Sequence, residues 1–75
     1  MHLKILRVMA NLTQAEAAAK VGVTQAALSD WENGKYRPSP AAISKLAEVY
    51  NVTEADVLKA IEATNAARGG ESDAR

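Results

Sequence analysis

One segment in the first half of the chain carries polar side chains that repeat at helical spacing. They share a face of the helix predicted from about residue 24 to residue 33, opposite an apolar stripe that includes Leu28 and Trp31. This face comprises one alanine and four polar residues: Gln25, Ala26, Ser29, Asp30 and Asn33. Their amide, hydroxyl and carboxylate groups donate and accept hydrogen bonds. The chemistry that this face offers is therefore recognition of a polar partner.

Catalytic and cofactor chemistry have little support in the sequence. The chain has no Cys, which excludes disulfides, thiolate metal ligands and a cysteine nucleophile. Its one histidine, His2, lies at the beginning of the chain and has no partner that would make it a ligand. We therefore expect a protein that is not an enzyme and that holds no metal and no cofactor.

Length and patterning indicate one small domain. The 75 residues leave no room for two independent cores. Residues 1–7 mix apolar residues with charges, unlike a signal peptide, and no later stretch is long and apolar enough to span a bilayer. We expect a soluble, cytoplasmic domain in residues 1–66, followed by a polar, glycine-containing tail in residues 67–75 that is disordered.

For predicting a nucleic-acid partner, the distribution of charged residues along the chain is more informative than the net charge. The formal net charge of zero counts against a nucleic-acid partner if attraction by the whole molecule is required. However, residues 1–37 have more basic than acidic side chains, and residues 38–66 have more acidic than basic ones. The half that carries the polar face is thus net positive.

Local signals place the first two helices. The first is predicted from Leu3 to Ala10, followed by Asn11, a residue that tolerates the left-handed conformation at a helix end. The second begins at Gln14, because Thr13 and Glu16 have the spacing of a capping box, in which each side chain satisfies a backbone amide of the other.

A tight turn separates the second helix from the third. Gly22 ends the second helix, because it enters left-handed conformations without a Cβ penalty. Thr24 caps the third helix, which ends at Asn33 and Gly34. Two helices that cross closely need small and apolar residues between them. The segment supplies Ala17, Ala18, Val21, Val23, Leu28 and Trp31.

The second half of the chain predicts two more helices. A basic loop from Lys35 to Ser39 leads into the fourth helix, which is predicted from Pro40 to Tyr50 because Ser-Pro is a typical helix start. Thr53 and Asp56 repeat the capping signal, and the fifth helix should fade near Ala66.

The sequence from Leu12 to Gly34, LTQAEAAAKVGVTQAALSDWENG, strongly resembles the Cro/CI (XRE-like) helix-turn-helix domains. The likeness extends from Leu3 to about Ile61. It implies an all-α, five-helix, lambda-repressor-like fold that binds palindromic operator DNA as a symmetric dimer, with the third helix in the major groove. It also implies a transcriptional repressor or controller.

The resemblance implies base-contacting roles for Gln25, Ala26, Ser29 and Asp30. The Gln25 amide suits adenine N6 and N7, and the Ala26 methyl suits thymine. Asp30 departs from the family's usual choices, because phosphates repel a carboxylate; we expect it to pair with Lys35 or Arg37, with cytosine N4 as the alternative. The alternative for Gln25 and Ser29 is that they are solvated residues that contact no base.

The resemblance also implies phosphate contacts from Gln14, Asn33, Lys35, Tyr36 and Arg37. The alternatives are a solvated glutamine at Gln14, a helix-ending role for Asn33 and a solvated loop for the other three. Two further roles are structural. Arg7 and Glu32 are expected to form an ion pair between the first helix and the end of the third, and Trp31 is expected in the core.

Dimerisation is expected because one recognition helix reads few base pairs. The fifth-helix residues Val57, Leu58 and Ile61 are the candidate dimer interface, and the alternative is that they belong to the monomer core. A second function fits the same fold: a protein-interaction module or antitoxin that binds a partner through the fourth and fifth helices. A pure interaction module would not require the polar face or the basic loop.

Overall fold

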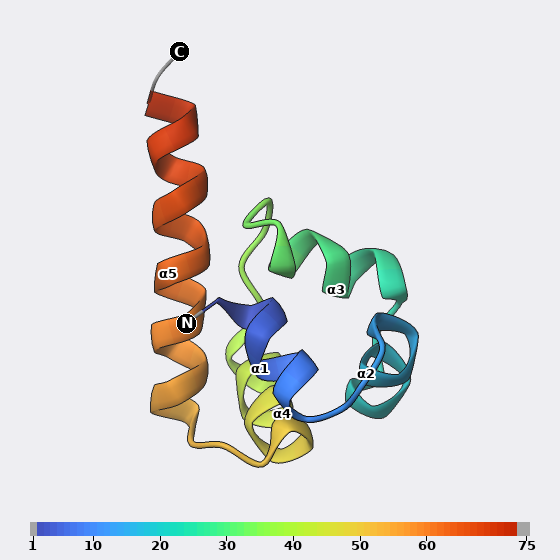
Figure 1. Cartoon of the computed structure of the whole chain (residues 1–75). Helices are drawn as coiled ribbons and strands as arrows, with labels where there is room; N and C mark the ends of the chain where they lie inside the picture. Colours follow the sequence, from blue (N-terminus) through green and yellow to red (C-terminus); the bar gives the residue numbers. More distant parts are fainter. Residues whose placement is uncertain (1, 74–75) are drawn as a thin grey trace.

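The computed structural model describes the backbone of residues 2–73 and the side chains of residues 2–66, and within these ranges it contains five helices and no strand. They are α1 (Leu3–Met9), α2 (Gln14–Val21), α3 (Gln25–Glu32), α4 (Pro40–Tyr50) and α5 (Glu54–Asp73) (Figure 1). The predicted all-α, five-helix fold is confirmed. No described helix has the length and apolar character that crossing a membrane requires.

Side-chain caps start four of the helices as predicted. Thr13 Oγ1 accepts from the Glu16 amide at 3.1 Å, and Glu16 Oε1 accepts from the Thr13 amide at 2.8 Å. Hydrogen bonding by Thr13, chiefly from its backbone amide to the carboxylate, holds the pKa of Glu16 below its usual value. Thr53 and Asp56 form the same reciprocal pair at the start of α5. Single hydroxyl caps begin α3 at Thr24 and α4 at Ser39.

The turn between α2 and α3 depends on Gly22, which has a φ of +86°. That left-handed conformation brings its amide to the Ala18 carbonyl at 2.8 Å and ends α2. Asn11 and Asn51 also adopt positive φ, at +62° and +56°, and they end α1 and α4. Helix α1 stops at Met9, one residue before the predicted end.

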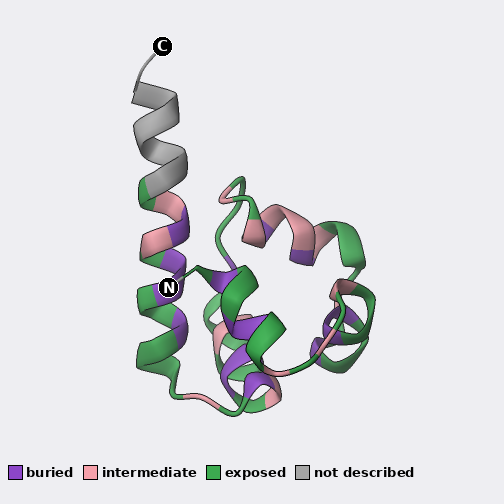
Figure 2. Cartoon of the chain, viewed as in Figure 1, coloured by how far each residue is buried: buried purple, intermediate pink, exposed green. Residues whose placement is uncertain are grey.

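The helices pack around one core, with their buried faces turned inward (Figure 2). The most completely buried large side chains are Leu28 on α3, Leu46 on α4, and Val57 and Ile61 on α5. Ala17 and Ala18 are buried where α2 packs against its neighbours, and Trp31 is 9% exposed, so its predicted place in the core is confirmed.

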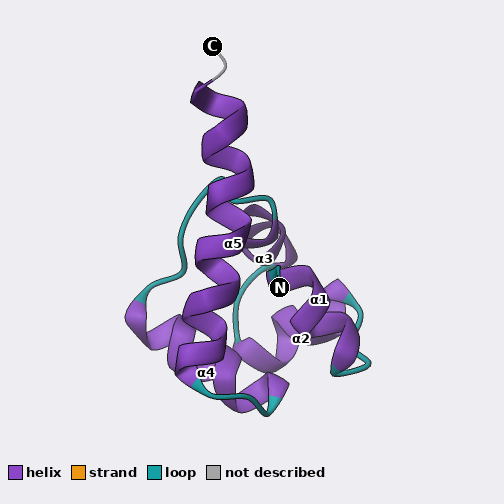
Figure 3. Cartoon of the chain, turned by 60° about the vertical axis from the view of Figure 1, so that its left-hand side comes forward, coloured by secondary structure: helices purple, strands orange, loops and turns teal. Residues whose placement is uncertain are grey.

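Helix α5 packs along α4 and α1 (Figure 3). At its inner face, Thr64 Oγ1 accepts from the Leu3 amide at 3.2 Å and donates to the Ala60 carbonyl. The Leu3 amide lacks a partner within its own helix and has no side-chain cap from His2. A buried hydroxyl from the other end of the chain therefore satisfies the start of α1.

The prediction that the fifth helix fades near Ala66 is wrong, because α5 continues to Asp73. Glycines 69 and 70 disfavour a helix by about 1 kcal/mol each relative to alanine, but unlike proline they do not block it. Of the predicted disordered tail, residues 67–73 have a helical backbone; their side chains, and residues 74 and 75 altogether, lie outside the described residues.

Candidate nucleic-acid interface

The face of α3 opposite the core carries the five residues singled out in the sequence. Leu28 is 1% exposed, whereas Gln25, Ala26 and Asn33 are exposed and Ser29 and Asp30 are half-buried. The Asn33 amide donates to Ser29 Oγ at 3.4 Å, so these two side chains meet one turn apart. The structure therefore brings the predicted base-contacting residues together on one surface, which the described residues leave at least half open to solvent.

A chain of hydrogen bonds runs from the interior to this surface. Arg7 Nε donates to Glu32 Oε2 at 2.6 Å, and Arg7 Nη2 donates to Glu32 Oε1 at 3.2 Å. Glu32 Oε1 also accepts from Gln14 Nε2 at 3.1 Å. Gln14 Oε1 in turn accepts from Gln25 Nε2 at 3.2 Å. The Gln25 side chain at the start of α3 is thus tied to a buried ion pair.

The Arg7–Glu32 ion pair is the buried end of this series of hydrogen bonds. The side chains are 10% and 6% exposed, and Arg7 Nη1 also donates to the Leu12 carbonyl at 3.0 Å. Its hydrogen bonds to Glu32 raise the pKa of Arg7 despite the burial, so the guanidinium stays charged. The expected link between α1 and the end of α3 is present in the structure. Removing one partner would leave an uncompensated buried charge, a loss of about 3 to 5 kcal/mol.

The Gln14 side chain is not free to act only as a phosphate ligand, because it is hydrogen-bonded to two other side chains. One of its amide hydrogens goes to Glu32 and its oxygen to Gln25, which leaves one N–H for an outside acceptor. Gln25 uses a single N–H in this contact, so its oxygen and its second N–H stay available. Gln14 therefore orients Gln25, a role that sequence reasoning missed.

The basic loop lies beyond the end of α3, and Lys35, Tyr36 and Arg37 are all exposed in it. Lys35 Nζ lies 5.6 Å from the centre of the Tyr36 ring, a cation–π distance. Arg37 Nη2 is 3.0 Å from Glu62 Oε1 of α5, and both side chains are more than half exposed. Nothing in the sequence indicates that Glu62 pairs with Arg37, because the two residues lie 25 positions apart.

The expected pairing of Asp30 with Lys35 or Arg37 is wrong for this structure. Arg37 pairs with Glu62, and Lys35 lies over the Tyr36 ring. The link between Asp30 and Lys35 is through the backbone, where the Lys35 amide donates to the Asp30 carbonyl at 2.9 Å. The Asp30 carboxylate forms no ion pair with any described residue.

Sequence comparison agrees with this geometry: the profile of the helix-turn-helix family matches residues 3–57, most of the chain. The chain belongs to the helix-turn-helix family. This confirms the resemblance to Cro/CI domains drawn from the sequence. Residues 3–57 of this helix-turn-helix protein include α1 to α4 and the first turn of α5.

Its curated relatives include viral and archaeal proteins. It is 38% identical over 60 residues to an "ImmF control region 10 kDa protein" of Bacillus phage phi105, a match that covers 80% of this chain and 66% of that protein, just under two thirds. An uncharacterized HTH-type transcriptional regulator of Archaeoglobus fulgidus is 38% identical over 76% of this chain and 80% of its own length. One of Methanocaldococcus jannaschii is 38% identical over 75% and 85%. No solved structure matches the chain significantly.

Proposed function

We propose that this helix-turn-helix protein is a transcriptional regulator that reads double-stranded DNA by laying α3 in the major groove. The observation that carries the proposal is the uncovered polar face of α3, in which Gln25 is held by Gln14 and the Arg7–Glu32 pair behind it. A side chain already ordered in the free protein loses less conformational entropy when it binds. Relatives named for a control region and for transcriptional regulation support the same function.

Base reading is assigned to four residues of α3. The free N–H and the oxygen of the Gln25 amide match the N7 acceptor and N6 donor of adenine. The exposed Ala26 methyl suits the C5-methyl of thymine, and Ser29 suits a base edge. Asp30, which forms no ion pair in the described chain, is assigned to cytosine N4.

Phosphate contacts are assigned to the ends of this surface. At one end, the remaining N–H of Gln14 is assigned to a phosphate. At the other end, phosphate contacts are assigned to Asn33, Lys35, Tyr36 and Arg37. We further propose that two copies bind a palindromic operator in the cytoplasm, because a two-fold pair of recognition helices matches half-sites about one DNA turn apart.

Selection of bound duplexes from a random pool by the full chain tests the proposal and identifies the site. We expect enrichment of a palindrome. On that sequence, Gln25→Ala should lose about 1 to 3 kcal/mol of binding free energy, and on a scrambled duplex it should lose much less.

Gln25→Met is the matched variant, because it keeps the length of the side chain but removes the amide donor and acceptor without adding a charge. It should also lose affinity selectively on the selected duplex. Equal losses on the selected and scrambled duplexes would contradict base reading by Gln25, and failure to bind any duplex at low salt would contradict DNA binding altogether.

A further inference from the structure

Asn33 ends α3, is exposed, and is followed directly by a glycine. An asparagine loses its side-chain amide when the backbone nitrogen of the next residue attacks its Cγ and closes a five-membered ring. A Cβ on the next residue hinders this attack, and glycine has none. Asn33 and Gly34 therefore form the dipeptide at which an asparagine is chemically least protected.

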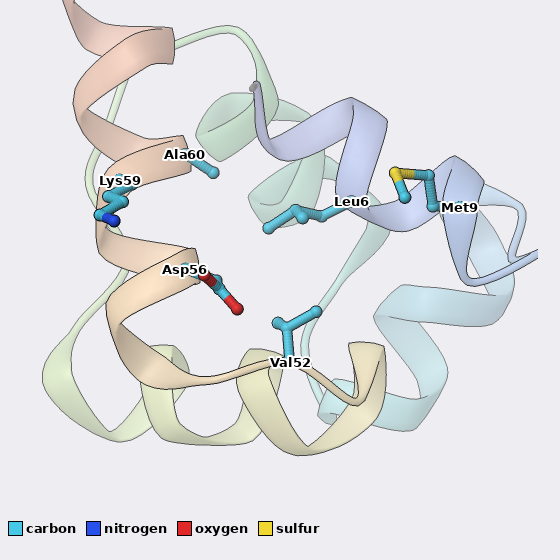
Figure 4. Close-up of a pocket in the computed structure, with 6 residues that line it drawn as sticks. All are labelled: Leu6, Met9, Val52, Asp56, Lys59 and Ala60. Atoms are coloured by element: carbon cyan, nitrogen blue, oxygen red, sulfur yellow. The ribbon is translucent and has the colours of Figure 1, made fainter.

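The other three asparagines of the chain each precede a residue that has a Cβ. Asn51 is the best match to Asn33, because it is also exposed and also ends a helix. It precedes Val52, whose amide donates to the Ala47 carbonyl at 3.0 Å and whose branched side chain points into a groove between α1 and α5 (Figure 4). The groove, of about 340 Å³, is lined by Leu6, Met9, Val52, Asp56, Lys59 and Ala60. Packing and a Cβ thus shield the nitrogen after Asn51.

The bonds that hold Asn33 and Gly34 in place belong to the last turn of α3. The Gly34 amide donates to the Trp31 carbonyl at 3.2 Å, and Gly34 has a φ of +74°. The Asn33 side-chain amide donates to Ser29 Oγ at 3.4 Å, which is long for a hydrogen bond. The last turn of a helix frays at little cost in free energy, so these bonds open while the core stays folded. Opening frees the Gly34 nitrogen to attack.

We propose that Asn33 is a site of spontaneous deamidation that weakens DNA binding as the protein ages. The Gly34 nitrogen forms a bond to Asn33 Cγ, and the side-chain nitrogen leaves as ammonia with the proton that the Gly34 nitrogen gives up. Water then opens the resulting succinimide at either of its carbonyls, which leaves aspartate or isoaspartate. Either product carries a carboxylate in place of the neutral amide.

The new carboxylate would lie where negative charge is least favourable. The end of α3 already carries the negative pole of the helix dipole, and Asp30 stands one turn earlier on the same face. A phosphate that accepts from the Asn33 amide is repelled by a carboxylate. This consequence rests on the proposed function, but the chemical change at Asn33 does not. Because phosphate contacts carry no sequence information, affinity should fall for every duplex.

Peptide mapping by mass spectrometry tests the chemistry without DNA. The full chain is held folded in neutral buffer, and the acidic products at each asparagine are measured over time. We expect deamidation at Asn33 to be about tenfold or more faster than at the matched Asn51, because only Asn33 precedes a residue without a Cβ. Equal rates at the two residues, or an Asn33 that stays intact, would overturn the proposal.

Asn33→Asp and Asn33→Gln form a matched pair for the effect on DNA. Freshly purified Asn33→Asp should bind every duplex about tenfold more weakly than the unaltered chain, and the aged unaltered chain should approach it. Asn33→Gln keeps an amide but closes the larger ring slowly, so its affinity should not change with age. A fresh Asn33→Asp that binds as tightly as the unaltered chain would overturn the proposal. If the fresh unaltered chain binds no duplex, the proposed function fails instead, and the peptide map still reports on Asn33.

Discussion

Arg37 has two competing partners in the proposed complex. In the free protein it is paired with Glu62 at 3.0 Å, and in the complex it is assigned to a phosphate. An exposed pair of this kind is worth about 0 to 1 kcal/mol, far less than a fixed structural contact. We therefore expect Glu62 to weaken DNA binding slightly and equally at every sequence.

Variants of the two residues of this pair should change DNA affinity in opposite directions. Arg37→Ala should lower affinity for every duplex and reduce the slope of log affinity against log salt by about one charge. Glu62→Gln should raise affinity by up to about fivefold, because it removes the competitor of the phosphate.

Glu48→Gln is the control for this effect. It removes one exposed carboxylate and so changes the net charge equally, but Glu48 faces Lys45 and not the loop. If Glu62→Gln and Glu48→Gln raise affinity by the same amount, general electrostatics would explain the gain and the pair with Arg37 would have no role. An unchanged salt slope in Arg37→Ala would remove Arg37 from the phosphate contacts.

At the level of elements, the angle between α2 and α3 depends on the backbone of one residue. Gly22 has a φ of +86°, and a Cβ built there would meet no atom within 4 Å. Substitution by a larger residue is therefore opposed by backbone strain and not by a clash.

Gly22→Ala should lower the free energy of unfolding by about 1 to 2 kcal/mol, measured by chemical denaturation. Gly22→Asn should lose less, because asparagine tolerates the left-handed region. If alanine at this position proved as stable as glycine, the turn would not require the left-handed conformation.

At the level of the whole molecule, the buried residue Tyr50 makes the stability of the fold depend on pH. Tyr50 is 5% exposed at the end of α4, and burial, with the nearby negative charge of Glu32, raises its pKa from 10.0 to about 12. The folded protein thus favours the neutral phenol. Because the folded pKa is the higher one, this contribution to stability is complete below pH 10 and is lost as the pH rises toward 12.

We therefore expect the free energy of unfolding to fall between about pH 10 and pH 12, and to fall less steeply in Tyr50→Phe. Urea denaturation at a series of pH values measures the difference between the two proteins. Parallel stability curves across this interval would show that Tyr50 is not protected from ionisation. Absorbance of the phenolate, followed in both proteins, identifies the titration step that Tyr50 contributes.

The three fifth-helix residues expected at a dimer interface divide between the core and the surface. Val57 and Ile61 are 0% and 1% exposed in the core, and only Leu58 of the three is exposed. The alternative reading of Val57 and Ile61 as monomer core is confirmed.

The sequence by itself determined where the helices begin and which face of α3 turns away from the core. Caps such as Thr13 with Glu16, and stops such as Gly22, act between residues a few positions apart, so their spacing predicts where helices begin and end. The apolar stripe of Leu28 and Trp31 likewise decides which side of α3 faces solvent, because the core must cover it. The family and the five-helix fold follow from the same local pattern.

Apart from the Arg7–Glu32 pair, which the family resemblance implied, only the tertiary structure decided which distant side chains meet. Arg37 pairs with Glu62 and not with Asp30, and Gln14 bridges Glu32 and Gln25, because packing brings together residues that lie 11 to 25 positions apart. It also placed α1 beside α5 and so formed the groove. A charged or amide side chain can bond to any suitable neighbour, and the fold alone determines which neighbour is within reach.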